Sequence, residues 1–327
     1  MTAGLILAAA LGGPFPLLCT PYTEKGELDC EVLAKEARFV ADGGANGVIW
    51  PAADEALKLL TPDEERRGWA AIVDALKDRG IWFCPCCPGT NVTDQLRRLA
   101  DAARAAEAVP TLKLTALVRM TNDATTDEQY RTQYETVAKA VRHPVIIQTY
   151  NGKSPAPSAR LLIDLATRHP DRFGWVKDEG SSYSINDHMA ELAASDAIKT
   201  VFSGWGGRDW LYQYRRIGTR GVISQRPQYV SLMVKLWKAL EANDPAAEEL
   251  AMKWSYLRNA DDFLPSKNMR GWNLYTLVKL GVFRNMLSRE AKEDGNAKGW
   301  TLTETVLKPR EIAEADQRLK SAGICLP

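Results

Sequence analysis

The sequence has few of the residues that form metal sites or bind polyanions. It contains only three histidines, and beside the cluster Cys84, Cys86 and Cys87 no second Cys or His pair has zinc-ligand spacing. Positive and negative side chains nearly cancel, with 42 Lys plus Arg against 41 Asp plus Glu. Because nucleic acids and anionic membrane surfaces attract a positive excess, neither is expected as a partner. We expect small molecules or further copies of the same chain instead.

Long apolar runs are also missing. No segment reaches the roughly 18 uninterrupted apolar residues that a membrane helix needs, and the apolar run 4–11 follows no Lys or Arg, so export is not expected. The six cysteines are interpreted as small, reduced core thiols rather than metal ligands. This cysteine usage predicts a cytoplasmic protein.

Short β-branched or aromatic runs alternate with amphipathic stretches along most of the chain. Eight strand candidates are found at residues 16–19, 47–50, 81–84, 112–118, 145–149, 173–176, 199–202 and 221–224. Stretches with helical spacing lie between them, at residues 30–41, 62–76, 93–106, 127–141, 158–168 and 209–217. Regular alternation of this kind predicts a parallel sheet.

Helix-start signals support this division. Thr61 is followed by Pro62 and by acids in the first predicted turn, and Asn91 and Ser158 are similar N-cap candidates. No G-x-G-x-x-G fingerprint follows the first strand, as a doubly wound sheet would often have. Eight βα units in about 230 residues therefore predict an α/β fold, a closed (β/α)8 TIM barrel.

After Gln228 the pattern changes to helix upon helix. Helical spacing is found at residues 230–242, 246–261, 272–280 and 309–321, and residues 290–299 are interpreted as a polar loop. We predict a catalytic barrel at residues 14–228 and a C-terminal helical extension at residues 229–327, which includes the last barrel helix.

Lys177 follows the sixth predicted strand, where apolar residues give way to polar ones and a glycine. At the mouth of a barrel an ammonium group loses solvation, which favours a neutral amine that can attack a ketone and form a Schiff base. The alternative is a solvated surface lysine. Asp178 and Glu179 follow it and either tune the amine or are themselves solvated.

Spaced motifs in one order connect this chain to a known family. These are T-P-Y at 20–22, a glycine-rich second strand at 43–49, L-T-P-D-E-E-R at 60–66, Y-N at 150–151, V-K at 176–177, S-G at 203–204 and G-V-I-S at 221–224. With these motifs the chain resembles the dihydrodipicolinate synthase and N-acetylneuraminate lyase family from about residue 14 to residue 323.

The resemblance implies specific roles for several residues. Lys177 would be the Schiff-base nucleophile that condenses with a 2-oxo acid, and Tyr150 would shuttle protons. The predicted substrate-binding positions are Ala52, Ala53, Glu55, Arg119, Ser203, Ile223 and Arg226. The chemistry would need neither a metal nor an organic cofactor, since the protonated imine is the electron sink. Relatives are commonly tetramers built from dimers, so a homo-oligomer is expected.

The chain departs from the family at the substrate site. Ala52 and Ala53 stand where the family has two threonines, the paired tyrosines after strand four are absent, and Lys153 follows the Y-N pair without the family's arginine. These losses argue against authentic dihydrodipicolinate synthase activity. New polar residues occupy the predicted rim, and we hypothesise that Arg226 or Arg119 binds the substrate's carboxylate in place of the threonines.

Two functions remain open at this stage. The first is a Schiff-base-forming lyase or aldolase acting on pyruvate or another 2-oxo acid. The alternative is a barrel that binds an oxo acid or sugar acid without turning it over, which the loss of both threonine hydroxyls favours.

Overall fold

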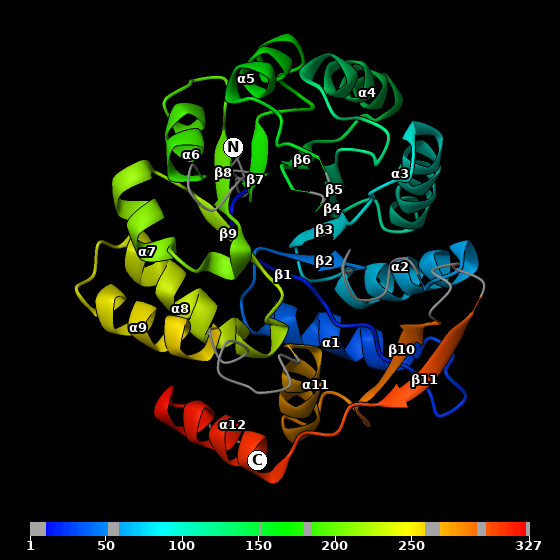
Figure 1. Cartoon of the computed structure of the whole chain (residues 1–327), viewed down its shortest axis with the longest axis vertical. Coiled ribbons are helices and arrows are strands. Elements are labelled where there is room, and N and C mark those ends of the chain that lie inside the picture. The colour runs from blue at the N-terminus through cyan, green and yellow to red at the C-terminus, as the bar shows by residue number, and fades with distance from the viewer. Residues whose placement is uncertain are drawn as a thin grey trace, which may run out of the picture.

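Parallel strands surround the centre of the molecule. The computed structural model describes residues 11–51, 59–150, 152, 154–179, 185–258, 269–292 and 299–324. The strands around the centre are β1 (Gly13–Pro16), β2 (Gly47–Trp50), β3 (Trp82–Pro85), β4 (Lys113–Leu114), β5 (Ala116–Arg119), β6 (Val145–Gln148), β7 (Trp175–Asp178), β8 (Thr200–Ser203) and β9 (Gly221–Ser224) (Figure 1).

Two sheets form the ring. One has the order β1-β9-β8-β7-β6-β5 and the other the order β2-β3-β4. Parallel bridges join them, from Leu17 to Ile49 on one side and from Cys86 to Leu117 on the other. Since β4 and β5 are two halves of one predicted strand, the ring has the eight strand positions that the sequence predicts.

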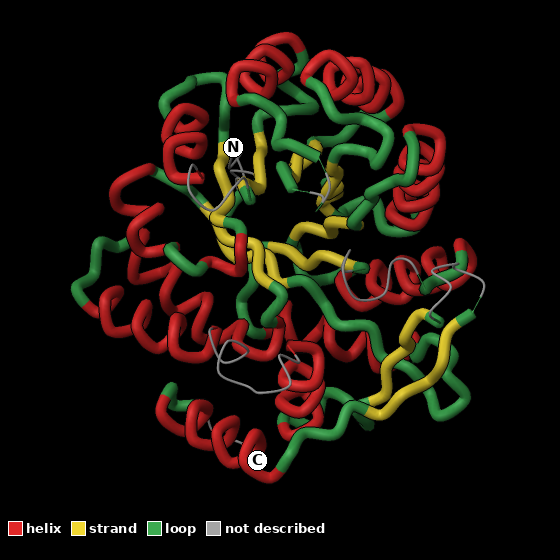
Figure 2. The backbone as a smooth tube through the Cα atoms, in the orientation of Figure 1, coloured by secondary structure: helices red, strands yellow, loops and turns green. Residues whose placement is uncertain are grey.

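Helices cover the outside of the ring, as the ribbon and tube views show (Figures 1 and 2). They are α1 (Cys30–Asp42), α2 (Pro62–Leu76), α3 (Val92–Glu107), α4 (Asp127–Ala140), α5 (Ala159–Arg168), α6 (Ile185–Ala193), α7 (Trp210–Tyr212) with the π-helical turn Gln213–Ile217, and α8 (Val230–Glu241). The predicted N-caps are confirmed: side-chain oxygens of Thr61, Asn91 and Ser158 accept backbone N–H groups of the first turns.

The interior of the ring and its outer face have separate apolar cores. Ile49, Leu117, Ile146 and Trp175 belong to the inner cluster, whereas their chain neighbours Val48 and Val176 pack toward the helices. Successive side chains of a strand point to opposite faces. The barrel is therefore filled beneath its mouth, and chemistry is left to the strand ends.

The strand that carries Lys177 runs further than the sequence indicates. The prediction ended it at Val176, but β7 continues to Asp178, so Lys177 lies within the strand. Because Trp175 is in the inner cluster, the alternation turns Lys177 inward as well. The first strand is also shifted: β1 ends at Pro16, and Leu17 continues the ring only as a bridge.

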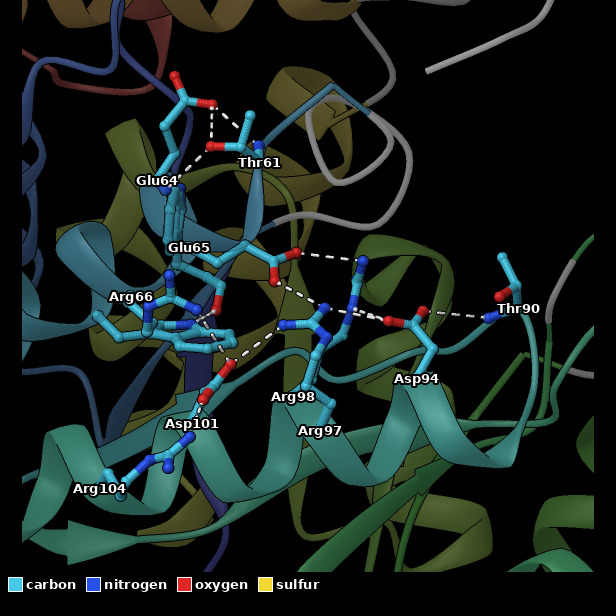
Figure 3. Close-up of polar contacts among 12 residues, drawn as sticks. Thr61, Glu64, Glu65, Arg66, Thr90, Asp94, Arg97, Arg98, Asp101 and Arg104 are labelled. Atoms are coloured by element: carbon cyan, nitrogen blue, oxygen red, sulfur yellow. Dashed lines mark hydrogen bonds and ion pairs between the residues drawn. The ribbon is translucent and has the colours of Figure 1, made fainter. Parts of the chain in front are cut away.

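A buried ionic network fastens α2 to α3 (Figure 3). The carboxylate of Glu65 on α2 lies 3.3 Å from Arg97 and 3.2 Å from Arg98 on α3. Asp94 and Asp101 of α3 flank the two arginines. Burial raises the pKa of Glu65, and the charges of Arg98 and Arg97 oppose that shift. These contacts fix the start of α2, which follows the segment that contains Ala52 and Ala53.

The chain after β9 combines helices with a hairpin that the sequence did not predict. Helices α8, α9 (Ala246–Arg258), α11 (Met269–Lys279) and α12 (Pro309–Ser321) agree with the helical spacing, but β10 (Leu287–Ala291) pairs antiparallel with β11 (Trp300–Glu304). Arg289 of this hairpin forms a buried ion pair with Glu64 of α2. Among the described residues, no helix is both long and apolar enough to cross a membrane.

Candidate active site

Lys177 lies at the carboxyl end of the ring between two partner strands. On β6 its register partner is Gln148, and on β8 it is Phe202. Its side chain is almost completely buried, with 4% of its surface exposed. The ammonium Nζ lies 3.1 Å from Oε2 of Glu179. Because a buried charge is costly unless it is paired, this contact compensates the loss of water around both groups.

Glu179 is held in place by donors from two other elements. Gln148 Nε2 donates to Oε2 at 2.6 Å, and the backbone N–H of Trp205 donates to Oε1 at 3.0 Å. Gly204 permits this approach, because a Cβ there would lie 2.2 Å from Cγ of Glu179. Both carboxylate oxygens therefore have fixed partners, and the carboxylate is directed at the lysine.

A second chain of hydrogen bonds supports the outer face of the same strand end. The Glu179 N–H donates to Thr149 Oγ1 at 2.8 Å, and this hydroxyl donates to Asp178 Oδ1 at 2.7 Å. His188 on α6 lies 2.8 Å from Asp178 Oδ2 through Nδ1 and 3.0 Å from the Pro157 carbonyl through Nε2. Since both partners only accept, these contacts favour the protonated imidazole, in which both ring nitrogens donate.

The lysine opens onto a cavity of about 280 Å³. The residues that line it are Gln148, Tyr150, Lys177, Glu179, Trp205, Gly206, Ile223, Gln225, Arg226 and Arg258. Tyr150 is 40% exposed and packs on Trp205, with ring centroids 5.0 Å apart. An aromatic pair and two arginines thus line the cavity into which the amine opens. A cavity of this size suits a small organic anion.

Arg226 is the buried cation of this wall. Its side chain is 3% exposed, and Nη1 donates to the Gln225 carbonyl at 3.1 Å. Nη2 donates to the carbonyl of Arg258 at 3.4 Å, and Arg258 in turn donates to the carbonyl of Trp205. These bonds hold the guanidinium in place in the cavity wall.

The structure gathers four of the predicted site residues around this cavity: Lys177, Tyr150, Ile223 and Arg226. Ser203 lies elsewhere, because its hydroxyl donates to Gln213 on the outer side of β8. Arg119 is the register partner of Gln148 and faces the barrel mouth, but it does not line the cavity that the described residues form. Ala52, Ala53 and Glu55 lie outside the described residues, as does Lys153.

Sequence reasoning assigned no firm role to Glu179, which pairs with the lysine, or to Gln148, its register partner on β6. Glu179 was left open between tuning the amine and being solvated, yet only 7% of its surface is exposed, and Gln148 was given no role. The available signal was strand periodicity: with Lys177 inside the strand, position 179 points to the same face. Because the predicted strand ended at Val176, the sequence did not indicate that residues 177 and 179 share one face.

Of the five cysteines among the described residues, Cys19, Cys84, Cys86 and Cys87 are buried. Burial raises the pKa of the Cys84 and Cys87 thiols well above their usual value. They therefore stay protonated, in agreement with their predicted place in the core. Within the described ranges, no group of three or more His, Cys, Asp or Glu residues could hold a metal ion.

Comparison with known proteins gives curated relatives and solved structures that resemble this chain. No family model matches the chain. The 4-hydroxy-tetrahydrodipicolinate synthase of Mycolicibacterium paratuberculosis is 26% identical over 226 residues, which cover 68% of this chain and 70% of the relative.

Solved structures agree with the fold over nearly the whole chain. The dihydrodipicolinate synthase from Aquifex aeolicus has a TM-score of 0.78 at 19% identity and covers 96% of this chain and 99% of its own. YagE, an E. coli K12 prophage protein of the dihydrodipicolinic acid synthase family in complex with pyruvate, has a TM-score of 0.77 at 18% identity, covering 97% and 100%. The predicted barrel is thus the fold of these proteins.

The Asp178–His188 pair makes stability depend on pH. Burial disfavours the imidazolium, but the hydrogen bond and charge of Asp178 outweigh it, so the pKa of His188 is raised above 6.5. Its stabilisation is complete below about pH 6.5 and is lost as pH rises through the folded-state pKa. We expect the difference in unfolding free energy between wild type and His188→Gln to shrink with rising pH in denaturant titrations.

The matched control is His143→Gln. Burial lowers the pKa of His143, so its contribution is lost as pH falls, which is the opposite sign. A His188→Gln difference that stays constant or grows with rising pH would contradict the assignment.

Proposed function

We propose that this chain, a divergent member of the dihydrodipicolinate synthase and N-acetylneuraminate lyase family, is a lyase or aldolase that acts on pyruvate or another 2-oxo acid through an imine on Lys177. The observation that carries the proposal is the buried Lys177 amine, which opens onto a cavity with Tyr150 and Arg226 in its wall. The pyruvate complex of one structural relative supports a 2-oxo acid as the substrate.

The chemistry follows from an amine and a ketone held together in a small cavity. The Lys177 amine attacks the keto carbon, water leaves, and the protonated imine withdraws electrons from the adjacent carbon. Loss of a proton or of a substituent from this adjacent carbon gives an enamine. Through the enamine, a carbon–carbon or carbon–oxygen bond near the adjacent carbon then forms or breaks. Tyr150 lines the same cavity, where its phenol moves a proton to or from the second substrate. No cofactor is needed on this route.

Arg226 is the better of the two candidates for the carboxylate of the oxo acid. Its guanidinium is buried in the wall of the lysine cavity, whereas Arg119 lies beyond the lining residues. Ala52 and Ala53 carry no hydroxyl groups, so a charged donor replaces the missing pair in this proposal. A different carboxylate site implies substrates other than those of authentic dihydrodipicolinate synthase.

The second candidate function is a binding barrel without turnover. The ion pair between Lys177 and Glu179 favours it, because a paired ammonium cannot attack a ketone until it loses a proton. In this alternative, the cations of the cavity would bind an oxo acid or sugar acid that never forms a covalent bond to Lys177.

Three further predictions remain proposals. We infer a catalytic barrel at residues 14–228 followed by C-terminal helices, and α8 already packs against the barrel core through Val230 and Val234. A homo-oligomer and a cytoplasmic location also remain expectations, the first from the family resemblance and the second from the reduced thiols.

Borohydride trapping tests the proposed function directly. Incubation with pyruvate and borohydride, followed by peptide mass spectrometry, is expected to give one reduced adduct on Lys177, because the reagent fixes an imine as a stable amine. The adduct should be absent from Lys177→Ala and retained in Lys199→Ala, which removes an exposed lysine outside the cavity. A wild-type protein that gives no adduct with any 2-oxo acid would leave only the binding barrel.

Steady-state kinetics test the carboxylate site. Arg226→Ala is expected to raise KM for the oxo acid about ten- to hundredfold, since a hydrogen bond to a charged group contributes roughly 1.5–3 kcal/mol. Arg119→Ala serves as the matched control at the same barrel mouth and should change KM less. An unchanged KM in a folded Arg226→Ala would remove this arginine from the site.

A further inference from the structure

We propose that Glu179 is a catalytic residue that carries protons for Lys177 during imine formation. The inference rests on the proposed function and assigns the step that makes the amine reactive. Its basis is the 3.1 Å contact between Glu179 Oε2 and Lys177 Nζ inside the barrel mouth.

The carboxylate is the proton acceptor among the groups that line the cavity. The other titratable lining residues are Tyr150, Lys177, Arg226 and Arg258, none of which has a carboxylate. Gln148 also contacts Glu179, but its amide donates and does not take a proton. Among the lining residues, the short path for the ammonium proton therefore leads to the carboxylate oxygen 3.1 Å away.

The support around Glu179 fits a carboxylate that is alternately charged and neutral. Gln148 and the Trp205 N–H donate to it whether or not it holds a proton, so its position is maintained through the cycle. The bond from the Glu179 N–H to Thr149 fixes its backbone. Gly204 leaves just enough space for the side chain. Rigid support of this kind keeps a proton carrier within reach of both reacting atoms.

The proton balance closes within the pair. Glu179 takes one proton from the Lys177 ammonium, and the free amine forms a bond to the keto carbon while the carbonyl electrons move to oxygen. The carboxylic acid protonates that oxygen, and the carboxylate then takes a proton from the alkylated nitrogen. Returning this proton to the hydroxyl group breaks the carbon–oxygen bond and releases water. The products are a protonated imine, one water and a regenerated carboxylate, which now pairs with the imine cation.

The same pairing explains how a buried ion pair and a nucleophilic lysine coexist. Before substrate binds, the carboxylate compensates the buried ammonium; after the reaction it compensates the iminium. The site therefore keeps one positive and one negative charge at both ends of the imine-forming step. Both groups are neutral only transiently, before the carbon–nitrogen bond forms and again before the carbon–oxygen bond breaks.

Single-turnover trapping tests the role. Pyruvate is mixed with enzyme, and borohydride quenches samples over time, so that the adduct on Lys177 gives the rate of imine formation. Glu179→Gln keeps the size of the side chain but cannot carry a proton, and we expect a rate roughly 10²- to 10⁴-fold lower. Glu191→Gln, which removes an exposed carboxylate on α6, is the matched control and should react at the wild-type rate.

Chemical rescue separates proton transfer from support of the structure. Glu179→Ala is expected to be slow and to regain speed with added formate, which a purely structural role would not produce. If neither variant folds, infrared difference spectroscopy of the wild type on mixing with pyruvate replaces them. A transient protonated-carboxyl band then supports the proposal, and its absence overturns it.

The outcomes distinguish the two proposals. If the wild type forms the adduct and Glu179→Gln forms it slowly, both the imine chemistry of Lys177 and the role of Glu179 are supported. Wild-type adduct with an equally fast Glu179→Gln overturns the role of Glu179 and leaves the lysine chemistry intact. A wild type that forms no adduct on Lys177 overturns the proposed function and, with it, this inference.

Discussion

The buried contact between Lys177 and Glu179 is the interaction on which the site depends. Two buried charges are stable only when they form an ion pair and when their remaining hydrogen-bonding groups also have partners. Gln148 from β6 and the Trp205 N–H after β8 satisfy the carboxylate, so three neighbouring segments of the barrel converge on one ion pair. The pair fixes where the amine points, and it sets the condition that the amine must lose a proton before it can react.

The barrel provides this convergence through its strand alternation. On β7 and just beyond it, Lys177 and Glu179 turn inward and Asp178 turns outward, where His188 and Thr149 hold it against the helix layer. The carboxyl end of β7 therefore has polar contacts on both its inner and its outer face. The inner face supplies a reactive amine above a filled apolar interior, and the outer face keeps the strand end from moving.

Most of the fold could be predicted from periodicity, but the contacts of the lysine could not. Alternating strands and helices, with caps such as Thr61, predicted the ring, and the end of the sixth predicted strand led to Lys177. Strand ends are set by hydrogen bonds to neighbouring strands, which a single sequence does not display, so β7 was predicted to end two residues too early and the role of Glu179 was left open. The hairpin β10–β11 was missed because its strands contain charged residues such as Arg289, whose partner Glu64 is far away in the sequence.

The central claim is that Lys177 becomes covalently linked to an oxo acid while Glu179 remains its partner. A crystal structure of the protein soaked with pyruvate measures both at once. The account predicts continuous density between Nζ of Lys177 and the keto carbon, with a Glu179 oxygen within hydrogen-bonding distance of the linked nitrogen. Pyruvate bound in the cavity without a bond to nitrogen, beside an intact ammonium–carboxylate pair, would contradict it.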